Sequence, residues 1–234
     1  MNFTPHFEKA YMLKRYKRFF VDIELTNGQP LTIHCPNTGT MANCWALGNQ
    51  CWFSRNDNPK RKLPGTLELT ETPDNYICGV NTQRANYLVR EGIENGTIKE
   101  LQGYKNIYKE VSYGEERSRI DILLTKANQN CYVEIKNMTF NLKNGHIVFP
   151  DAKTERGVKH LRELIKMVKK GFRSVLIFCV QHSGAVSTGI AGDIDPLYTQ
   201  TIRVALDEGV EVIAYKCDLS PERIRLEKKL PFSI

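Results

Sequence analysis

The chain has 234 residues, of which 41% are hydrophobic and 25% are charged. This composition excludes global disorder, the absence of any run of about 18 apolar residues excludes a membrane-spanning helix, and the length suits one large domain or two small ones. Lys and Arg outnumber Asp and Glu by 33 to 26, a net charge of +7, which favours a polyanionic partner because cations that neutralise phosphates release condensed counterions.

The first eighty residues predict short strands joined by polar turns. Residues 18–25 alternate apolar and charged side chains after Phe19, as a half-buried strand does. Asn27-Gly28 supplies the positive φ angles of a tight hairpin before the return strand at 30–35. Three more strands are expected at 50–54, 66–70 and 76–80. Five such strands predict an OB-like closed barrel over residues 1–81, with a small β-sandwich as the alternative.

From about residue 82 the pattern changes to that of a mixed α/β domain. A helix is expected from Thr82 through Val89, ending at Gly92 or at residues 95–96. The later elements expected in chain order are strands at 107–113, 118–124 and 131–138, with Asn128-Gln129-Asn130 as the turn before the third, a helix at 154–170, a strand at 174–180, a helix at 196–208 and a strand at 210–215. This order predicts a mixed sheet with helices over residues 82–234, and an α/β (α+β) chain as a whole.

The helix at 154–170 and the strand that follows it have the clearest patterns. Val158, Leu161, Leu164, Ile165 and Val168 form one apolar stripe, and Gly171 is placed to end the helix. Residues 174–180 are a continuous β-rich apolar run, which predicts a strand buried on both faces.

Three charged residues on otherwise apolar strands are the sharpest functional signal. Asp121 lies between two isoleucines, and Glu134 and Lys136 flank a third on the next predicted strand. Side chains alternate across a strand, so Glu134 and Lys136 share a face, and pairing of the two strands as a hairpin lets Asp121 converge with them. Charges on apolar strands are costly unless they are paired or bound to metal. These three residues are therefore the predicted catalytic site.

Two carboxylates offer the oxygen ligands that suit Mg²⁺ or Mn²⁺. Lys136 would then lie beside the metal-bound water, where it can orient the water or stabilise developing negative charge. Glu110, on the preceding strand, is a candidate third ligand, or else a partner of Lys109 or Arg119. The alternative for Glu134 and Lys136 is an exposed ion pair on the solvent face of a hairpin.

Basic residues beside aromatic ones predict a nucleic-acid surface on the barrel. Residues 14–20 hold four positive charges and three aromatic rings. OB-folds often hold single-stranded nucleic acid in a positive groove with aromatic stacking platforms. The predicted backbone contacts here are Arg15, Lys17, Arg18, Lys60, Arg61 and Lys62. The alternative is that the aromatic residues belong to the core and the basic ones to ordinary surface.

Arg156 and Lys159 extend the predicted phosphate contacts to the helix at 154–170. They lie in its first turns, nearest the preceding loop at 149–151. Glu155, Lys159, Arg162 and Lys166 recur along one edge of this helix. For that edge, a solvated face with i, i+4 pairs such as Glu155 to Lys159 is the competing interpretation.

The cysteines and the N-terminus indicate the compartment. Seven cysteines form an odd set without a C-x-x-C pair, which predicts neither a disulfide framework nor paired zinc hooks. His34 with Cys35, Cys44 and Cys51 could bind a metal, but such cysteines are more often buried hydrophobes. Residues 1–7 lack the layout of a signal peptide. We therefore expect a soluble, cytoplasmic protein.

The Asp-then-Glu-x-Lys pattern on adjacent strands resembles the PD-(D/E)XK nuclease superfamily, although Ile120 stands where the superfamily name has Pro. Nearly the full chain resembles the sugar fermentation stimulation protein A family of bacteria and archaea. The residues that carry this second resemblance are 15–19, 34–39, 113–114, 116–121, 133–136, 149–152, 154–157 and 159–161.

These resemblances imply an OB-like domain followed by a nuclease-like domain. By the superfamily pattern, Asp121 and Glu134 carry over as metal ligands and Lys136 as the catalytic lysine. The family resemblance also implies DNA as the partner, single- or double-stranded and without strong sequence specificity. The function expected is that of a DNA-binding protein with a Mg²⁺- or Mn²⁺-dependent nuclease site. The alternative is a regulator of sugar (maltose) metabolism that binds DNA, cleaves nothing and reuses the nuclease fold.

Overall fold

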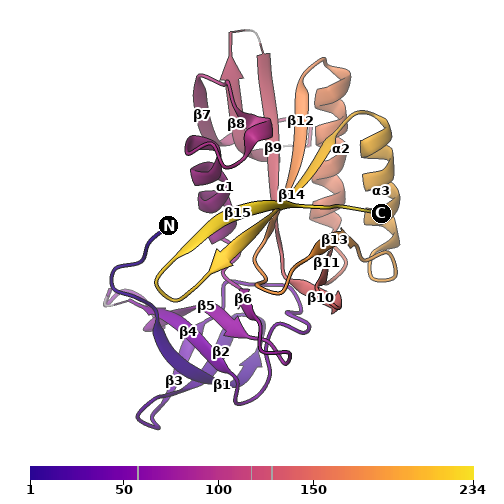
Figure 1. Ribbon diagram of the computed structural model, residues 1–234. Coiled ribbons are helices and arrows are strands. Elements are labelled where there is room, and N and C mark those ends of the chain that lie inside the picture. The colour runs from indigo at the N-terminus through magenta and orange to yellow at the C-terminus, as the bar shows by residue number, and fades with distance from the viewer. Residues whose placement is uncertain (57, 117, 128) are drawn as a thin grey trace.

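Two parts make up the chain, a small β-barrel and a larger α/β part that stands above it in Figure 1. The computed structural model describes residues 1–56, 58–116, 118–127 and 129–234. Arg117, in a motif quoted above, and Asn128, in the predicted turn, lie outside these residues. None of the helices in the described ranges is long and apolar enough to cross a membrane.

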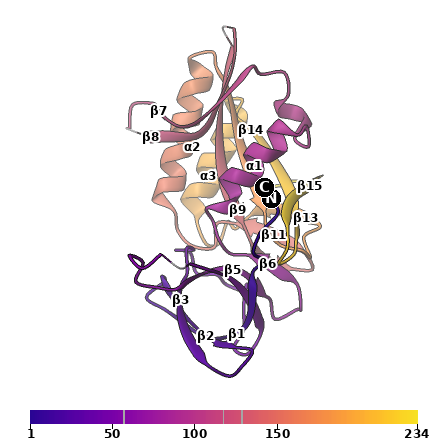
Figure 2. The same ribbon diagram turned by 90° about the vertical axis from the view of Figure 1, so that its left-hand side faces the viewer.

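The barrel is built from the first strands of the chain, and Figure 2 shows it as a ring. These strands are β1 (Glu8–Tyr16), β2 (Phe20–Leu25), β3 (Pro30–His34), β4 (Gln50–Arg55), β5 (Gly65–Glu71) and β6 (Ile77–Gly79). They pair in the order β3-β2-β1-β4-β5-β6, and a further pairing of β3 with β5 closes the ring. The predicted OB-like closed barrel is therefore confirmed.

The membership of the barrel differs from the prediction at β1 and β6. In β1, Ala10 and Met12 point inward, but a register shift between Met12 and Lys14 leaves Leu13 37% exposed. Such a bulge interrupts the two-residue period, so the segment has the pattern of a basic run rather than of a strand. β6, expected as the fifth barrel strand, pairs with β5 outside the ring.

The larger part is a six-stranded mixed sheet covered by helices on both faces (Figures 1 and 2). Its strands, in the order β15-β14-β12-β9-β8-β7, are β7 (Asn106–Tyr113), β8 (Ser118–Lys126), β9 (Gln129–Met138), β12 (Arg173–Val180), β14 (Glu211–Leu219) and β15 (Ile224–Leu230). Helix α1 (Arg84–Glu94) and the 3₁₀ helix η1 (Lys99–Leu101) pack on one face, and α2 (Glu155–Lys169) and α3 (Pro196–Asp207) pack on the other. The central strands β9, β12 and β14 are parallel and the outer ones antiparallel. This arrangement confirms the predicted mixed-sheet domain.

The predicted end of α2 and the predicted burial of β12 are also present, because Gly171 follows the helix with a φ of 85° and its N donates to the Val168 oxygen at 2.8 Å. Thr154 Oγ1 accepts a hydrogen bond from Gly157 N at 3.0 Å, which caps the start of α2, and every residue of β12 after Arg173 is buried. A second, three-stranded sheet of β10 (Phe140–Lys143), β11 (His146–Phe149) and β13 (Ser187–Ile190) was not predicted. Four-residue strands offer too few positions for a periodic pattern.

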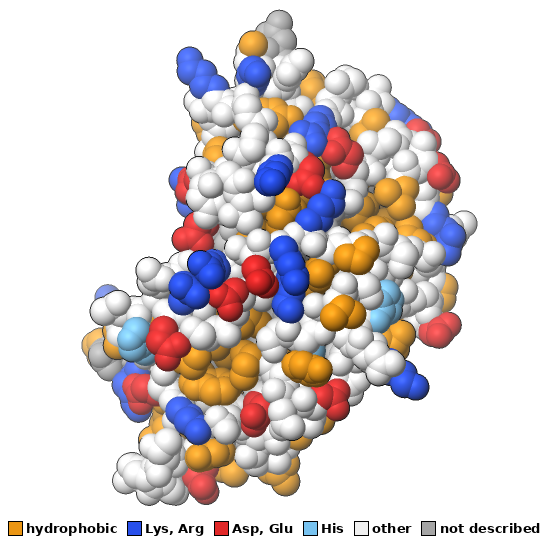
Figure 3. Space-filling model, in the orientation of Figure 1, with side chains coloured by type: hydrophobic (Ala, Val, Ile, Leu, Met, Phe, Trp, Pro, Cys, Tyr) orange, Lys and Arg blue, Asp and Glu red, His pale blue; other side chains and the backbone are white. Residues whose placement is uncertain are grey.

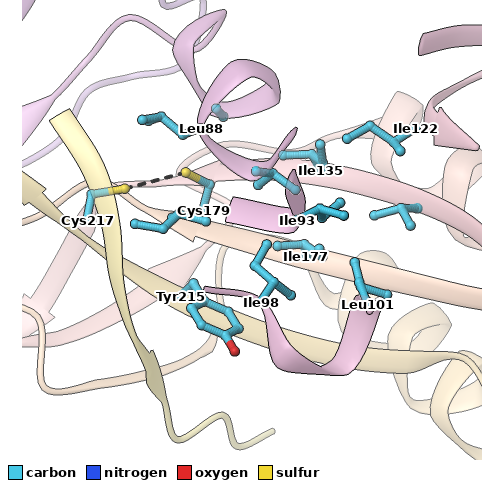
Figure 4. Close-up of a cluster of buried hydrophobic side chains, with 14 of the residues drawn as sticks. Leu88, Ile93, Ile98, Leu101, Ile122, Ile135, Ile177, Cys179, Tyr215 and Cys217 are labelled. Atoms are coloured by element: carbon cyan, nitrogen blue, oxygen red, sulfur yellow. Dashed lines mark hydrogen bonds between the residues drawn. The ribbon is translucent and has the colours of Figure 1, made fainter. Parts of the chain in front are cut away.

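The core under α1 includes the first residues of the chain. Leu88 of α1 lies in one buried cluster with Ile122, Ile135 and Ile177 of the sheet (Figure 4), and Phe3 and Phe7 belong to the same cluster. The N-terminal ammonium of Met1 lies 2.8 Å from a Glu91 carboxylate oxygen of α1. Residues 1–7, which the predicted barrel domain of 1–81 includes, therefore pack on the α/β part.

All seven cysteines are buried and unpaired by disulfides. Cys35, Cys44, Cys51 and Cys78 lie in the barrel core, and Cys179 and Cys217 lie 3.6 Å apart, sulfur to sulfur, under α1 (Figure 4). They pack as small hydrophobic side chains, in agreement with the favoured interpretation of the sequence.

The loop that follows β3 joins the barrel to the α/β part. Met41 N donates to Asp151 Oδ2 at 3.0 Å, and Thr40 Oγ1 donates to the Asp151 backbone oxygen at 3.0 Å. A Cβ on Gly39 would lie 2.5 Å from Asp151 Oδ2, so this approach requires glycine. This loop thereby forms one wall of the junction between the two parts.

Candidate active site

Glu134 and Lys136 lie on the face of β9 that α2 covers. Lys136 Nζ donates to Glu134 Oε1 at 2.6 Å, and the same oxygen is bonded to Nδ1 of His160 from α2. Glu134 is 1% exposed, and its Oε2 atom has no hydrogen-bond partner in the part of the chain that the structure describes. The two-residue period thus brings Glu134 and Lys136 into direct contact. They form a buried pair rather than an exposed one.

Asp121 lies where β8 and β9 separate. The last residue pair of these two strands is Ile122 with Val133. At the next position of β8, the Asp121 carboxylate accepts a hydrogen bond from the backbone of β9 in place of a strand partner. Asp121 Oδ2 accepts from Ile135 N at 2.8 Å, and Oδ1 accepts from Asn86 Nδ2 of α1 at 2.9 Å. The carboxyl therefore lies between α1 and β9, whereas Glu134 and Lys136 face α2. A simple hairpin would place all three side chains on one face of the sheet. Here the Asp121 carboxyl instead lies in the gap where β8 and β9 separate.

The two carboxyl groups have opposite pKa shifts. Burial raises the pKa of Asp121, the charge of Glu134 adds to it, and the hydrogen bond from Ile135 N offsets only part, so that this pKa reaches about 6. Burial also raises the pKa of Glu134, but the Lys136 charge and the His160 hydrogen bond outweigh it and hold the pKa below its usual value. Glu134 is thus the readily ionised member of the pair, and a cation near both would favour ionisation of Asp121.

Two cavities meet at this site. The first, here called the junction cavity, has a volume of about 340 Å³ and lies between the barrel loop and the α/β part; its lining includes Arg18, Gly39, Asn86, Lys136, Asp151 and Lys153. The second, here called the helix cavity, has a volume of about 310 Å³ and is lined by Gln83, Asn86, Tyr87, Lys109, Glu110, Asp121 and Ile122. Asn86 borders both cavities and donates to Asp121, which lines the helix cavity, so both spaces lie near the Asp121 carboxyl.

His160 is the site residue that motif reasoning from the strands alone does not find. Nδ1 contacts a Glu134 carboxylate oxygen, which only accepts, so Nδ1 carries the proton that faces Glu134; Lys136 Nζ lies 3.2 Å from the same Nδ1, and Nε2 accepts from Arg156 Nε at 3.4 Å. The signal was present in the helix: position 160 lies three residues after Gly157 and four before Leu164, on the buried face of α2. A polar residue on the apolar face of a helix requires a partner, which here is Glu134.

Comparisons with known proteins assign both parts of the chain. Residues 83–223 match the family described as the sugar fermentation stimulation protein RE domain, and residues 13–79 match the SfsA N-terminal OB domain. The chain is 54% identical to the sugar fermentation stimulation protein homolog of Shewanella halifaxensis over 99% of both chains. It is 49% identical to the homolog of Azotobacter vinelandii over 98% of both chains.

The chain belongs to the sugar fermentation stimulation protein family. This confirms the family resemblance seen in the sequence. A solved structure, the Pyrococcus furiosus SfsA in complex with Ca²⁺, matches with a TM-score of 0.90 over 100% of this chain and 98% of that chain, at 23% identity. At this identity the match shows that the two proteins share a fold.

The acidic residues near the site offer two carboxylates, rather than a complete cluster, to a divalent cation. Within the described ranges no group of three or more His, Cys, Asp or Glu side chains is arranged to hold a metal. Glu110 lies exposed on β7 with a positive φ of 52° and borders the helix cavity with Asp121, so it is not part of a ready-made three-carboxylate centre. Two carboxylates remain for a cation: that of Asp121 and that of Glu134, whose Oε2 has no hydrogen-bond partner within the described ranges. This donor set fits Mg²⁺, which binds one or two carboxylates and completes its shell with water and substrate phosphate.

The predicted nucleic-acid contacts at the β1–β2 turn divide into two kinds. The Arg15 guanidinium donates to the backbone oxygens of Asn37, Gly39 and Thr40, at 2.7–3.0 Å, and so supports the loop wall of the junction cavity. Lys17 and Arg18 have positive φ angles in the turn, and Arg18 lines that cavity. Lys153, which was not predicted, lines the same cavity. The turn thus places Arg18 at the candidate site, while Arg15 is bonded within the chain.

The other predicted basic contacts lie at different distances from the site. Lys60, Arg61 and Lys62 are exposed on the β4–β5 loop, and Arg61 and Lys62 border a separate cavity with His34. Arg156 is exposed and reaches the site through His160. Lys159 Nζ donates to the backbone oxygen of Glu116, which ties it to the β7–β8 turn. Lys159 is half-buried and bonded within the chain, and the phosphate contact predicted for it stays a prediction.

The face of the molecule drawn in Figure 3 does not carry a continuous positive surface. Its Lys and Arg side chains are interspersed with Asp and Glu side chains. Examples of close pairs in the structure are Arg173 with Glu211 at 2.7 Å and Lys229 with Glu100 at 2.7 Å. Surface pairs of this kind stabilise little and neutralise each other's charge. The net charge of +7 therefore does not by itself locate a binding surface on this face.

Proposed function

We propose that this SfsA family member is a metal-dependent phosphodiesterase that acts on nucleic acid at the junction of its two parts. The observation that carries the proposal is the buried Glu134, which contacts Lys136 through one oxygen, has no hydrogen-bond partner among the described residues for the other, and raises the pKa of Asp121 through its charge. A buried carboxylate oxygen without a partner is costly unless a cation or water satisfies it.

The residues divide the chemistry between them. A Mg²⁺ or Mn²⁺ ion bound by Asp121 and Glu134 would supply Lewis-acid stabilisation of a phosphate oxygen. Lys136 Nζ, held at 2.6 Å from Glu134, is placed to donate to an attacking water or to the phosphate and to stabilise the negative charge that develops there. Glu134 in turn keeps Lys136 in position.

The substrate follows from the charge around the junction cavity. Arg18, Lys136 and Lys153 line it, which provides cations for a phosphodiester backbone. The junction cavity lies between the OB barrel and the α/β part, where a nucleic-acid strand held by the barrel would reach Lys136, and DNA is the substrate we propose. The Pyrococcus furiosus SfsA was solved with Ca²⁺, a cation that takes oxygen ligands, which supports an oxygen-coordinated cation here.

The test is incubation of the full chain with single- and double-stranded DNA and RNA in the presence of Mg²⁺, Mn²⁺ or EDTA. The proposal expects cleavage of DNA with either metal and none with EDTA. Binding without cleavage under every condition would instead favour a non-catalytic DNA-binding regulator of sugar metabolism. The lack of a ready-made centre of three metal-binding side chains among the described residues is the observation that favours this second function.

His160 is expected to act as a positioning residue for Glu134. Replacing it by Ala removes the donor at Nδ1, whereas Asn keeps an N–H donor near that point. We expect His160→Ala to raise the Mn²⁺ concentration needed for half-maximal cleavage by about 10-fold or more, the size of effect usual for residues that orient metal ligands. His160→Asn should restore most of the wild-type value. Equal metal dependence in the Ala variant and the wild type would show that His160 has only a packing role.

A further inference from the structure

We propose that the helix cavity binds one unstacked nucleobase against the ring of Tyr87, so that the preferred substrate is single-stranded or locally opened nucleic acid. This inference rests on the proposed function, because it places the base next to the phosphate that would react at Asp121. It adds a base-binding site that the metal-binding residues themselves do not require.

Tyr87 is the aromatic surface of the cavity. It lies on α1, next to the fully buried Leu88 and Val89, and is itself 53% exposed. A well-packed helix therefore holds an aromatic ring at the edge of an open space. The cost of ordering the ring has already been met by the fold, which favours stacking of a ligand on it.

The rest of the lining suits a nucleobase. Ile122 adds an apolar wall, and the amide side chains of Gln83 and Asn86 offer donors and acceptors for the edge of a base. The volume of about 310 Å³ falls at the lower end of the roughly 300–1,000 Å³ typical of small-molecule sites. An aromatic plane, an apolar wall and amide groups together are the chemistry by which proteins recognise unpaired bases.

Lys109 connects the base site to the backbone. Its ammonium lies 5.8 Å from the centre of the Tyr87 ring, in a cation–π arrangement, and the side chain is exposed on β7. A lysine on a flexible stem can leave the ring for a neighbouring phosphate when a base takes its place. Lys109 would then contact a phosphate of the same nucleic-acid strand whose base stacks on Tyr87.

The position of the cavity determines the strand preference. Asp121 and Asn86 line it and are bonded to each other at 2.9 Å, so a base in the cavity is directly beside the candidate metal site. Bases inside a duplex are stacked on their neighbours and do not reach such a cavity unless they are flipped out. A single strand presents its bases without that cost, which predicts tighter binding of single strands.

The structure offers a matched control. Tyr108 on β7 is 50% exposed, nearly the same as Tyr87, but it lines neither of the two cavities at the site. Loss of an exposed tyrosine ring as such therefore affects both variants equally. The two variants differ only in that replacing Tyr87 also removes the ring on which a base next to Asp121 would stack.

The test measures dissociation constants in EDTA, where no cleavage occurs, for a single-stranded oligonucleotide, its duplex and an abasic strand of the same length. We expect Tyr87→Ala to weaken binding of the single strand by about 5-fold or more, the effect typical of a lost stacking platform. Tyr87→Phe and Tyr108→Ala should bind it as the wild type does. The abasic strand should bind the Ala variant and the wild type equally.

Three outcomes would overturn the inference, and they are distinguishable. If the wild type binds nucleic acid but Tyr87→Ala binds the single strand with unchanged affinity, the base site is excluded and the proposed function stands. If the wild type binds none of the three strands, the proposed function fails and the base site fails with it. A loss that is as large on the abasic strand would also exclude stacking.

Discussion

Replacement of Glu134 by Gln is expected to lower cleavage of DNA by about 100-fold or more. The change removes the negative charge that both holds a cation and pairs with Lys136, and metal-assisted stabilisation of the transition state is worth several kcal/mol, at about 1.4 kcal/mol for each tenfold of rate. Lys136→Met should cause a comparable loss while leaving metal binding in place. Single-turnover cleavage rates with Mg²⁺ measure both effects.

Glu163→Gln is the matched control for this prediction. Glu163, on α2, is buried as Glu134 is; it accepts from Glu115 N at 2.8 Å and pairs with Lys166 at 2.9 Å, so it supports the β7–β8 turn rather than Lys136. Its replacement should lower stability and leave the cleavage rate of the folded protein unchanged. Equal loss of cleavage in the Glu163 and Glu134 variants would mean that the Glu134 effect is one of folding alone.

The stability of the protein is expected to fall as the pH drops from 6.5 to 4, in part because of His182. This side chain is fully buried where β6 meets the α/β part, with an isolated bridge between His182 and Cys78. Burial lowers its pKa, the nearby charge of Lys216 lowers it further, and the opposing effect of Asp74 leaves it at about 4, against 6.5 for a free histidine. The unfolded chain therefore binds a proton in this window that the folded chain does not.

The size and sign of this effect follow from proton linkage. A folded pKa below the unfolded one gives stability that is complete above pH 6.5 and is lost as the pH falls toward 4, here by about 3 kcal/mol in total. Urea unfolding at pH 7.5, 6, 5 and 4.5 measures it. His182→Asn keeps an acceptor for Gly184 N, which bonds Nδ1 at 3.1 Å, and should lose less stability than the wild type over that range. Parallel pH profiles for the two proteins would contradict the assignment.

The parts of the site that lie on one strand were predictable, and those that depend on two elements were not. Glu134 and Lys136 follow from the two-residue period of β9 alone. The position of Asp121 does not, because it depends on where β8 and β9 separate, which leaves its carboxyl to accept from Ile135 N. His160 required knowing which face of α2 packs on β9. The periodicity of a strand or helix can be read from neighbouring residues, whereas the contacts between two elements depend on how the whole chain folds.

The fold shows the same division. The barrel and the mixed sheet followed from alternating strands and from the stripe of α2, but β1 was obscured by its bulge at Met12 and by the basic residues around it. Arg15 illustrates the consequence for function. In the sequence it belongs to a basic run typical of phosphate contacts, but in the fold its guanidinium bonds the loop at 37–40. The sequence shows that Arg15 is a hydrogen-bond donor, but only the fold shows that its acceptors are backbone oxygens of the chain itself.

Direct titration of the protein with Mn²⁺, followed by electron paramagnetic resonance of the free ion, tests the central claim that Asp121 and Glu134 together bind a divalent cation. The account predicts a bound ion in the wild type and in Glu110→Gln, and an affinity at least about 10-fold weaker in Asp121→Asn and in Glu134→Gln, since each removes one of two charged ligands. Equal Mn²⁺ affinity in the wild type and in both of those variants would contradict it.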